Sequence, residues 1–172
     1  MKRLTSCLLL FAVISACYGQ QNLESLKNLK SQGNTMCQAF STKNFKTFTK
    51  YMYPKIIEMA GGEEKMVMAL ENKIKEMETQ GVKITSAKIG EPSEIIIMGT
   101  ELQSVVPQFL EIETGKETIV LESSLIAIST NSGTDWKFTD TAGKDITKMK
   151  SFFPNLSDKL IIPAPKQSMK SK

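Results

Sequence analysis

Histidine is absent from this sequence of 172 residues, and cysteine and tryptophan are scarce, with three copies and one copy. Without an imidazole, the chain has no Ser-His-Asp or Cys-His catalytic set, no histidine-ligated zinc or iron and no histidine pH switch. The sequence also has no glycine-rich phosphate loop, no paired-cysteine motif and no nucleophile elbow. We therefore expect neither a cofactor nor a metal ion, and catalysis is less expected than binding.

What the sequence does contain is ordinary for a globular protein, with 41% hydrophobic and 23% charged residues. The length suits one domain with a substantial core. The 22 basic residues against 18 acidic ones leave a net charge of only +4, half of which comes from Lys2 and Arg3. This balance argues against a nucleic-acid partner.

The first nineteen residues have the pattern of a signal peptide. Lys2 and Arg3 precede the apolar stretch Leu4–Ala16, and small residues follow it. The stretch is too short to cross a bilayer, which takes about 20 apolar residues. The sequence thus predicts an exported protein, periplasmic or secreted, with no transmembrane helix in its mature form.

Two interpretations of the processing site remain open. Cleavage after Gly19 is favoured, because small residues occupy the positions that signal peptidase I prefers. Alternatively, Ile14-Ser15-Ala16-Cys17 resembles a bacterial lipobox, which would make Cys17 the lipidated first residue of a membrane-anchored lipoprotein. In both cases Cys37 keeps no intramolecular partner for a disulfide, and its place on an apolar helical face predicts a buried, inert thiol.

Residues 20–162 are predicted to form a single domain that begins with helices. Asn22 is a candidate N-cap of the first helix. Its apolar face has helical spacing and consists of Leu23, Leu26, Leu29, Gly33, Met36, Cys37 and Phe40. Ser41 or Thr42 is expected to cap a second helix, and a short helix is expected from Pro54 to Ala60. After Gly61-Gly62, another helix leads to Gly81. Its apolar stripe is predicted to be core, and consists of Met66, Leu70, Ile74 and Met77.

Strands are predicted from Val82 onward, where apolar and polar residues alternate. The first segment begins at Val82 and Ile84 and precedes a turn at Gly90-Glu91-Pro92. The further expected segments are Glu94–Met98, Leu102–Glu113, Thr118–Thr130 and Trp136–Asp140, with turns between them. Pro107 implies an edge strand or a bulge, because proline cannot donate a ladder hydrogen bond. A short helix is expected from Asp145 to Phe153. Residues 163–172 are expected to be a flexible tail.

Helices followed by a meander of strands predict an α+β fold, with N-terminal helices packed on an antiparallel sheet of about four strands. The order of elements from Ser41 to Asp140 resembles the NTF2-like, cystatin-type cone. The segment Ser132-Gly133-Thr134-Asp135-Trp136-Lys137-Phe138-Thr139-Asp140 is similar to the last strand of small exported bacterial members. The resemblance implies a curved sheet that wraps a helix and leaves a pocket. One departure is that no small hairpin separates the second and third helices.

Carboxylates, an amide and aromatic side chains near such a pocket are the candidate ligand-contacting groups. They are Tyr51, Tyr53, Gln103, Glu111, Glu122 and Trp136. A pocket-facing carboxylate with a raised pKa would act as a general base. Glu111 and Glu122 are instead expected to face water on the convex side of the sheet, and Trp136 is expected in the core.

Three hypotheses about function follow. The favoured one is an exported, non-catalytic domain that binds a small apolar ligand or a partner protein of the envelope. The second is a structural or assembly protein of the envelope, acting through a sheet edge or the lysine-rich tail. The third, and least favoured, is an isomerase or hydrolase that uses an acid and a tyrosine.

Overall fold

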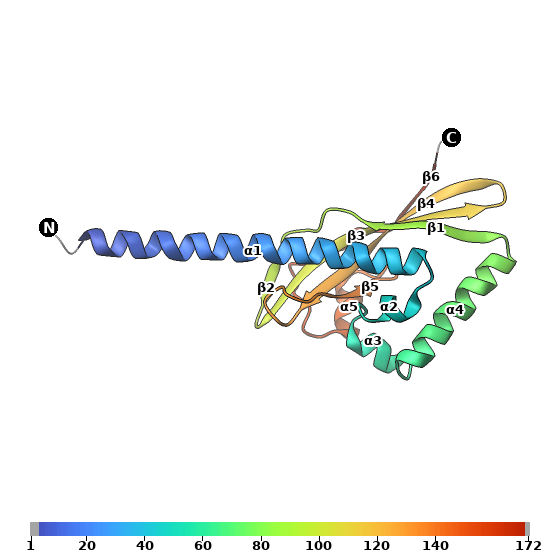
Figure 1. The fold of residues 1–172 in the computed structure, drawn as a ribbon, viewed down its shortest axis with the longest axis horizontal. Helices are drawn as coiled ribbons and strands as arrows, with labels where there is room; N and C mark the ends of the chain where they lie inside the picture. Colours follow the sequence, from blue (N-terminus) through green and yellow to red (C-terminus); the bar gives the residue numbers. More distant parts are fainter. Residues whose placement is uncertain (1–3, 171–172) are drawn as a thin grey trace.

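The computed structural model describes the backbone of residues 4–170 and the side chains of residues 22–170. The predicted signal segment at residues 1–19, including the Cys17 side chain, therefore lies outside the described side chains. Within the described backbone, five helices and six strands make an α+β fold in which a long N-terminal helix packs against a curled antiparallel sheet (Figure 1). The predicted fold class is thus confirmed. Among the described residues, no helix combines the length and apolarity that crossing a membrane requires.

Helix α1 runs without interruption over Leu4–Ser41, and its first half projects away from the rest of the molecule (Figure 1). The prediction of a helix start at Asn22 was wrong, because Asn22 lies inside α1 and is exposed. The second half of α1 packs closely on the sheet. A Cβ on Gly33 would come within 2.7 Å of the Ile89 Cδ1 atom on strand β1.

Helix α2 (Phe45–Thr49) is capped by Asn44, whose side chain accepts a hydrogen bond from the Thr47 amide. Ser41 and Thr42, the predicted caps, instead donate their hydroxyls to carbonyls of the last turn of α1. The prediction placed these hydroxyls at the start of α2, but they bond at the end of α1. A hydroxyl can donate to a free carbonyl as well as accept from a free amide.

Helices α3 (Pro54–Met59) and α4 (Glu63–Thr79) follow, with Pro54 in the first turn of α3 as predicted. Gly61 and Gly62 break the chain between them at positive φ angles. The prediction of a core stripe on α4 was wrong. No residue of α4 is buried, and its apolar stripe is only half-buried because the helix stands away from the sheet (Figure 1).

The sheet contains six strands, with the main order β1-β3-β4-β5. The longest pair, β3 with β4, keeps one antiparallel register from Leu102 opposite Ser129 to Thr114 opposite Glu117. A two-residue turn joins these strands, as the sequence predicts. The strand bounds are β1 Val82–Ile89, β2 Ile96–Met98, β3 Glu101–Thr114, β4 Glu117–Ser129, β5 Lys137–Asp140 and β6 Lys166–Met169.

Pro107 lies in β3, a central strand, so the prediction of an edge strand was wrong. Its carbonyl accepts a hydrogen bond from the Gly90 amide, on the side of β3 away from β4. In an antiparallel ladder the nitrogen and oxygen of one residue point to the same neighbour. The nitrogen of Pro107 therefore faces the loop between β1 and β2, and the ladder with β4 loses no hydrogen bond.

The two faces of the sheet carry separate cores. The face toward α1, here called the inner face, buries Val106, Leu125, Ala127 and Phe138 against Leu29, Met36, Cys37 and Trp136. The opposite, outer face buries Val105, Ile126 and Ile128 against helix α5 (Ile146–Phe152) and the chain after it. Alternation along β3 and β4 therefore divides the apolar residues between two layers.

The chain end is not a free tail in this structure. Strand β6 pairs antiparallel with β4, from Ile119 opposite Met169 to Glu122 opposite Lys166. The Lys170 amide also donates to the Thr118 carbonyl, and its ammonium pairs with Glu111 at 2.9 Å. All four side chains of β6 are exposed, so the sequence of this strand has no alternation of apolar and polar residues. Backbone pairing with β4 holds the strand, and no side-chain pattern predicts it.

Deleting residues 164–172 is expected to uncover the edge of β4 over residues 119–122. Amide hydrogen exchange in this segment should accelerate at least tenfold. The amide of Ile126, in the half of β4 that pairs with β5, serves as the internal control. Size-exclusion chromatography of the same variant should show self-association, because an uncovered strand edge can pair with another chain. Unchanged exchange over residues 119–122 would contradict the role assigned to β6.

Candidate functional site

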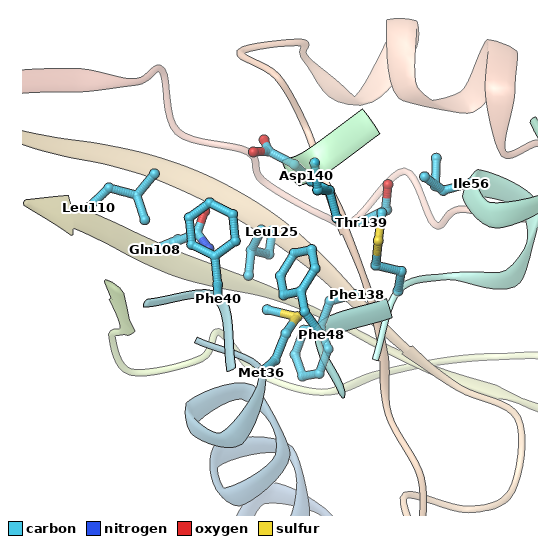
Figure 2. A pocket seen from close by; sticks show the side chains of 12 residues that line it. Met36, Phe40, Phe48, Ile56, Gln108, Leu110, Leu125, Phe138, Thr139 and Asp140 are labelled. Atoms are coloured by element: carbon cyan, nitrogen blue, oxygen red, sulfur yellow. The ribbon is translucent and has the colours of Figure 1, made fainter. Parts of the chain in front are cut away.

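An apolar cavity of about 290 Å³ lies between the helices and the inner face of the sheet (Figure 2). Nine of its twelve lining residues are apolar. Five chain segments meet around it, namely the end of α1, the α2–α3 region, α4, the β3–β4 pair and β5. The lining residues are Met36, Phe40, Phe48, Met52, Ile56, Leu70, Gln108, Leu110, Leu125, Phe138, Thr139 and Asp140.

The helical wall is built from aromatic and methionine side chains. The rings of Phe40 of α1 and Phe48 of α2 pack against each other at a tilt of 44°, with centroids 5.1 Å apart. Met52 is held in place by backbone pairing, because the flanking residues Tyr51 and Tyr53 both hydrogen-bond to the main chain of Phe138. Methionine and paired aromatic rings adapt to apolar guests of different shape.

The sheet wall comes from alternate residues of β3 and β4. Gln108 and Leu110 point inward from β3, and Leu125 does so from β4 (Figure 2). Phe40, Leu70 and Leu110 are only half-buried although they line the cavity, so the space connects to solvent. The cavity is open because α4 contributes Leu70 to its wall and does not close onto the sheet.

The cavity lining includes three polar residues, which differ in how deeply they are buried. Gln108 lies in the sheet wall and is only 6% exposed, whereas Asp140 is exposed at the rim. The Asp140 carboxylate accepts the Ala142 amide at 2.7 Å and so caps the turn after β5. Thr139 is buried beside it. The apolar lining is typical of a small-molecule site, and the volume is just below the usual range of about 300–1,000 Å³.

None of the six residues named from the sequence lines this cavity. Glu111 and Glu122 lie on the outer face of the sheet, because Leu110 points inward and Glu122 pairs opposite Phe109. The hydrogen bond from Lys170 lowers the pKa of the Glu111 carboxyl, and the charges of Lys170 and Lys88 lower it further. Glu111 is therefore held ionised, which is the opposite of what a general base in a cavity needs.

The remaining candidates have structural partners. The buried Gln103 amide donates to the Asn155 carbonyl and accepts the Ser157 amide, which ties the chain after α5 to β3. Trp136 is completely buried, as predicted, and its indole donates to the carbonyls of Ser25 and Gly133. Tyr51 packs half-buried against the inner core.

Tyr53 borders a second, larger hollow of about 480 Å³ outside the apolar cavity. Its ring meets Phe153 edge to face, burial raises the pKa of its hydroxyl, and the Glu101 carboxylate raises that pKa further. The polar groups of this hollow already bond within the protein, as Asn131 does with Asp135 and Lys137 with the Lys50 carbonyl. The exposed polar walls are typical of ordinary solvated surface, so the smaller apolar cavity is the better candidate site.

Cys37, predicted to be buried, is 2% exposed and packs in the inner core beside the cavity. Burial raises the pKa of its thiol, an effect that the hydrogen bond from Gln108 partly opposes. A neutral buried thiol is a poor nucleophile. Among the described residues, no group of three acidic or cysteine side chains is arranged to hold a metal ion.

No family model, curated protein or solved structure matches this chain. The resemblance to the NTF2-like cone therefore remains a prediction from the sequence, and the site has to be interpreted from its own geometry.

Proposed function

We propose that this protein is an exported, non-catalytic module that binds a small apolar ligand between its helices and the inner face of its sheet. The observation that carries the proposal is the open apolar cavity lined by Met36, Phe40, Phe48 and their neighbours. A ligand that enters this open apolar cavity removes apolar surface from water. This burial stabilises the complex by roughly 25 cal/mol per Å². The signal-like segment at residues 1–19 supports export.

Binding is preferred to catalysis because of where the acids lie. Glu111 and Glu122 are on the outer face of the sheet, and Asp140 is exposed at the rim and bonded to a backbone amide. A general base needs a carboxylate within hydrogen-bond reach of the reacting atom. The cone-shaped α+β architecture is also what the NTF2-like resemblance implies, and we propose membership of that superfamily on this ground.

Filling the cavity tests the proposal. The hydrocarbon dye diphenylhexatriene is expected to bind the wild-type protein and to become fluorescent. The Leu110→Trp variant should bind it at least tenfold more weakly, because the larger side chain occupies the cavity from the sheet wall. Fluorescence titration with the dye measures both affinities.

The matched control is Phe109→Trp, one residue earlier on β3 and on the outer face. This variant should bind the dye as wild type does, and circular dichroism verifies that both variants fold. Dye binding that is absent from wild type, or that survives in Leu110→Trp, would reject the proposal.

A further inference from the structure

Among the described residues that line the apolar cavity, Gln108 carries the one amide side chain, and it is strongly buried. It is 6% exposed, and it lies in the sheet wall between Leu110 and Leu125 (Figure 2). Buried amides in proteins are normally held by short, well-aligned hydrogen bonds. A polar group placed among apolar side chains is what fixes the orientation of a bound molecule.

The hydrogen bonds that Gln108 makes within the protein are long. Its Nε2 lies 4.0 Å from the Cys37 sulfur, a weak acceptor, and its Oε1 accepts the Ser123 hydroxyl at 3.4 Å. An amide has two N–H donors and two acceptor lone pairs. Gln103, on the outer face of the same strand, shows the contrast, with partners at 2.9 and 3.0 Å.

The charges around the cavity select against an anion. None of the twelve lining residues, all within the described part of the chain, is a lysine or an arginine. The one charged side chain among them is Asp140, whose carboxylate is at the rim. A carboxylate or phosphate that entered with its apolar body would lose water without gaining a cation, which is costly.

We propose that the ligand is a neutral molecule, with an apolar body and one hydroxyl or carbonyl group that hydrogen-bonds to the Gln108 amide. This inference rests on the proposed function and deepens it. Gln108 is then the specificity-determining residue, since it distinguishes a neutral polar end from a plain hydrocarbon. Because no lysine or arginine lines the cavity, the site also favours a neutral polar end over a carboxylate.

Three ten-carbon probes test the inference by displacing diphenylhexatriene from the full-length protein. We expect 1-decanol to displace the dye at least tenfold more effectively than decanoate at pH 8. Decylammonium reports whether Asp140 attracts a cation, and it is expected to be weaker than 1-decanol because its charge would also be desolvated. Equal or stronger displacement by decanoate or decylammonium would overturn the inference.

Substitution of the amide provides the second arm. In Gln108→Leu, which conserves most of the side-chain volume, the affinity for 1-decanol should fall about three- to tenfold, as for one lost hydrogen bond. The affinity for diphenylhexatriene, which has no hydrogen-bonding group, should be unchanged or higher. Ser124→Ala is the control, since Ser124 lies opposite Pro107 on the outer face of β4, and this variant should keep the wild-type affinity for 1-decanol.

The outcomes separate the two proposals. A dye that never binds in the cavity would reject the proposed function itself. A dye that binds, together with 1-decanol binding that is equal in wild type and Gln108→Leu, would reject only the role of Gln108. If Gln108→Leu does not fold, the comparison of 1-decanol with decanoate on the wild-type protein still decides the preference for a neutral ligand.

Discussion

Replacing Gly133 with alanine is expected to lower the free energy of unfolding by about 2–5 kcal/mol. Gly133 lies in the turn between β4 and β5, with φ at +83°, where a Cβ is disfavoured by about 1–2 kcal/mol. The new Cβ would also lie 2.2 Å from the Ser25 Oγ atom and 3.0 Å from the Ser25 Cα atom of helix α1. The backbone of α1 would have to move, which adds an overpacking cost of about 1–3 kcal/mol.

Gly143→Ala is the matched control. Gly143 has a similar φ of +73°, but the atom nearest its added Cβ is the Pro165 Cγ at 3.5 Å, an ordinary contact. This variant should therefore lose only the conformational cost of about 1–2 kcal/mol. Urea unfolding monitored by Trp136 fluorescence measures both variants. Equal losses would show that the close approach of α1 to the turn is not what makes Gly133 necessary.

A double variant identifies the atoms responsible. Ser25→Gly removes the two side-chain atoms that lie closest to the added Cβ, at 2.2 and 2.4 Å. The loss in Gly133→Ala combined with Ser25→Gly should be smaller than the sum of the two single losses, because residues in contact are not additive. Strict additivity would place the strain in the turn alone.

Trp136→Ala is expected to lower the free energy of unfolding by about 3–5 kcal/mol. Trp136 is completely buried in the inner core, and its indole donates to the carbonyls of Ser25 and Gly133 at 3.1 and 3.2 Å. Truncation leaves a cavity and removes a donor shared by the helix and the turn. Since domains are stable by only about 5–15 kcal/mol, either this change or Gly133→Ala removes a large part of the total.

Trp136→Phe separates packing from hydrogen bonding. Phenylalanine restores most of the apolar volume but not the indole N–H, so we expect a smaller loss of about 1–3 kcal/mol. Circular dichroism is the measurement for both variants, because Trp136 is the only tryptophan. A loss in Trp136→Phe as large as that in Trp136→Ala would assign the whole effect to the hydrogen bonds.

Local patterns predicted most of the secondary structure. Pro54 begins α3, Asp145 caps α5, and the two-residue turn joins β3 to β4, because each feature depends on residues close in sequence. The misplaced cap of α2 has a local cause, since a hydroxyl serves either end of a helix. The strand β6 escaped prediction because its exposed side chains carry no alternation and its stability comes from β4.

The same local patterns could not predict the candidate site. Leu70 belongs to a stripe with helical spacing, and such spacing cannot distinguish a helix that closes onto a sheet from one that stands away from it. Gln108 and Glu111 are three residues apart on one strand and therefore lie on opposite faces. Which face becomes the inner one depends on where α1 packs, and that is a long-range contact.

By itself, the sequence determined the α+β class, the burial of Trp136 and Cys37 and the exclusion of histidine chemistry, since composition and periodicity carry that information. Only the tertiary structure decided that Glu111 and Glu122 lie on the outer face and that Gln108 lines an open apolar cavity. The physical reason is that a cavity is made by the distances between elements. In this chain those distances follow from the close packing of α1 on the sheet and from the separation of α4 from it.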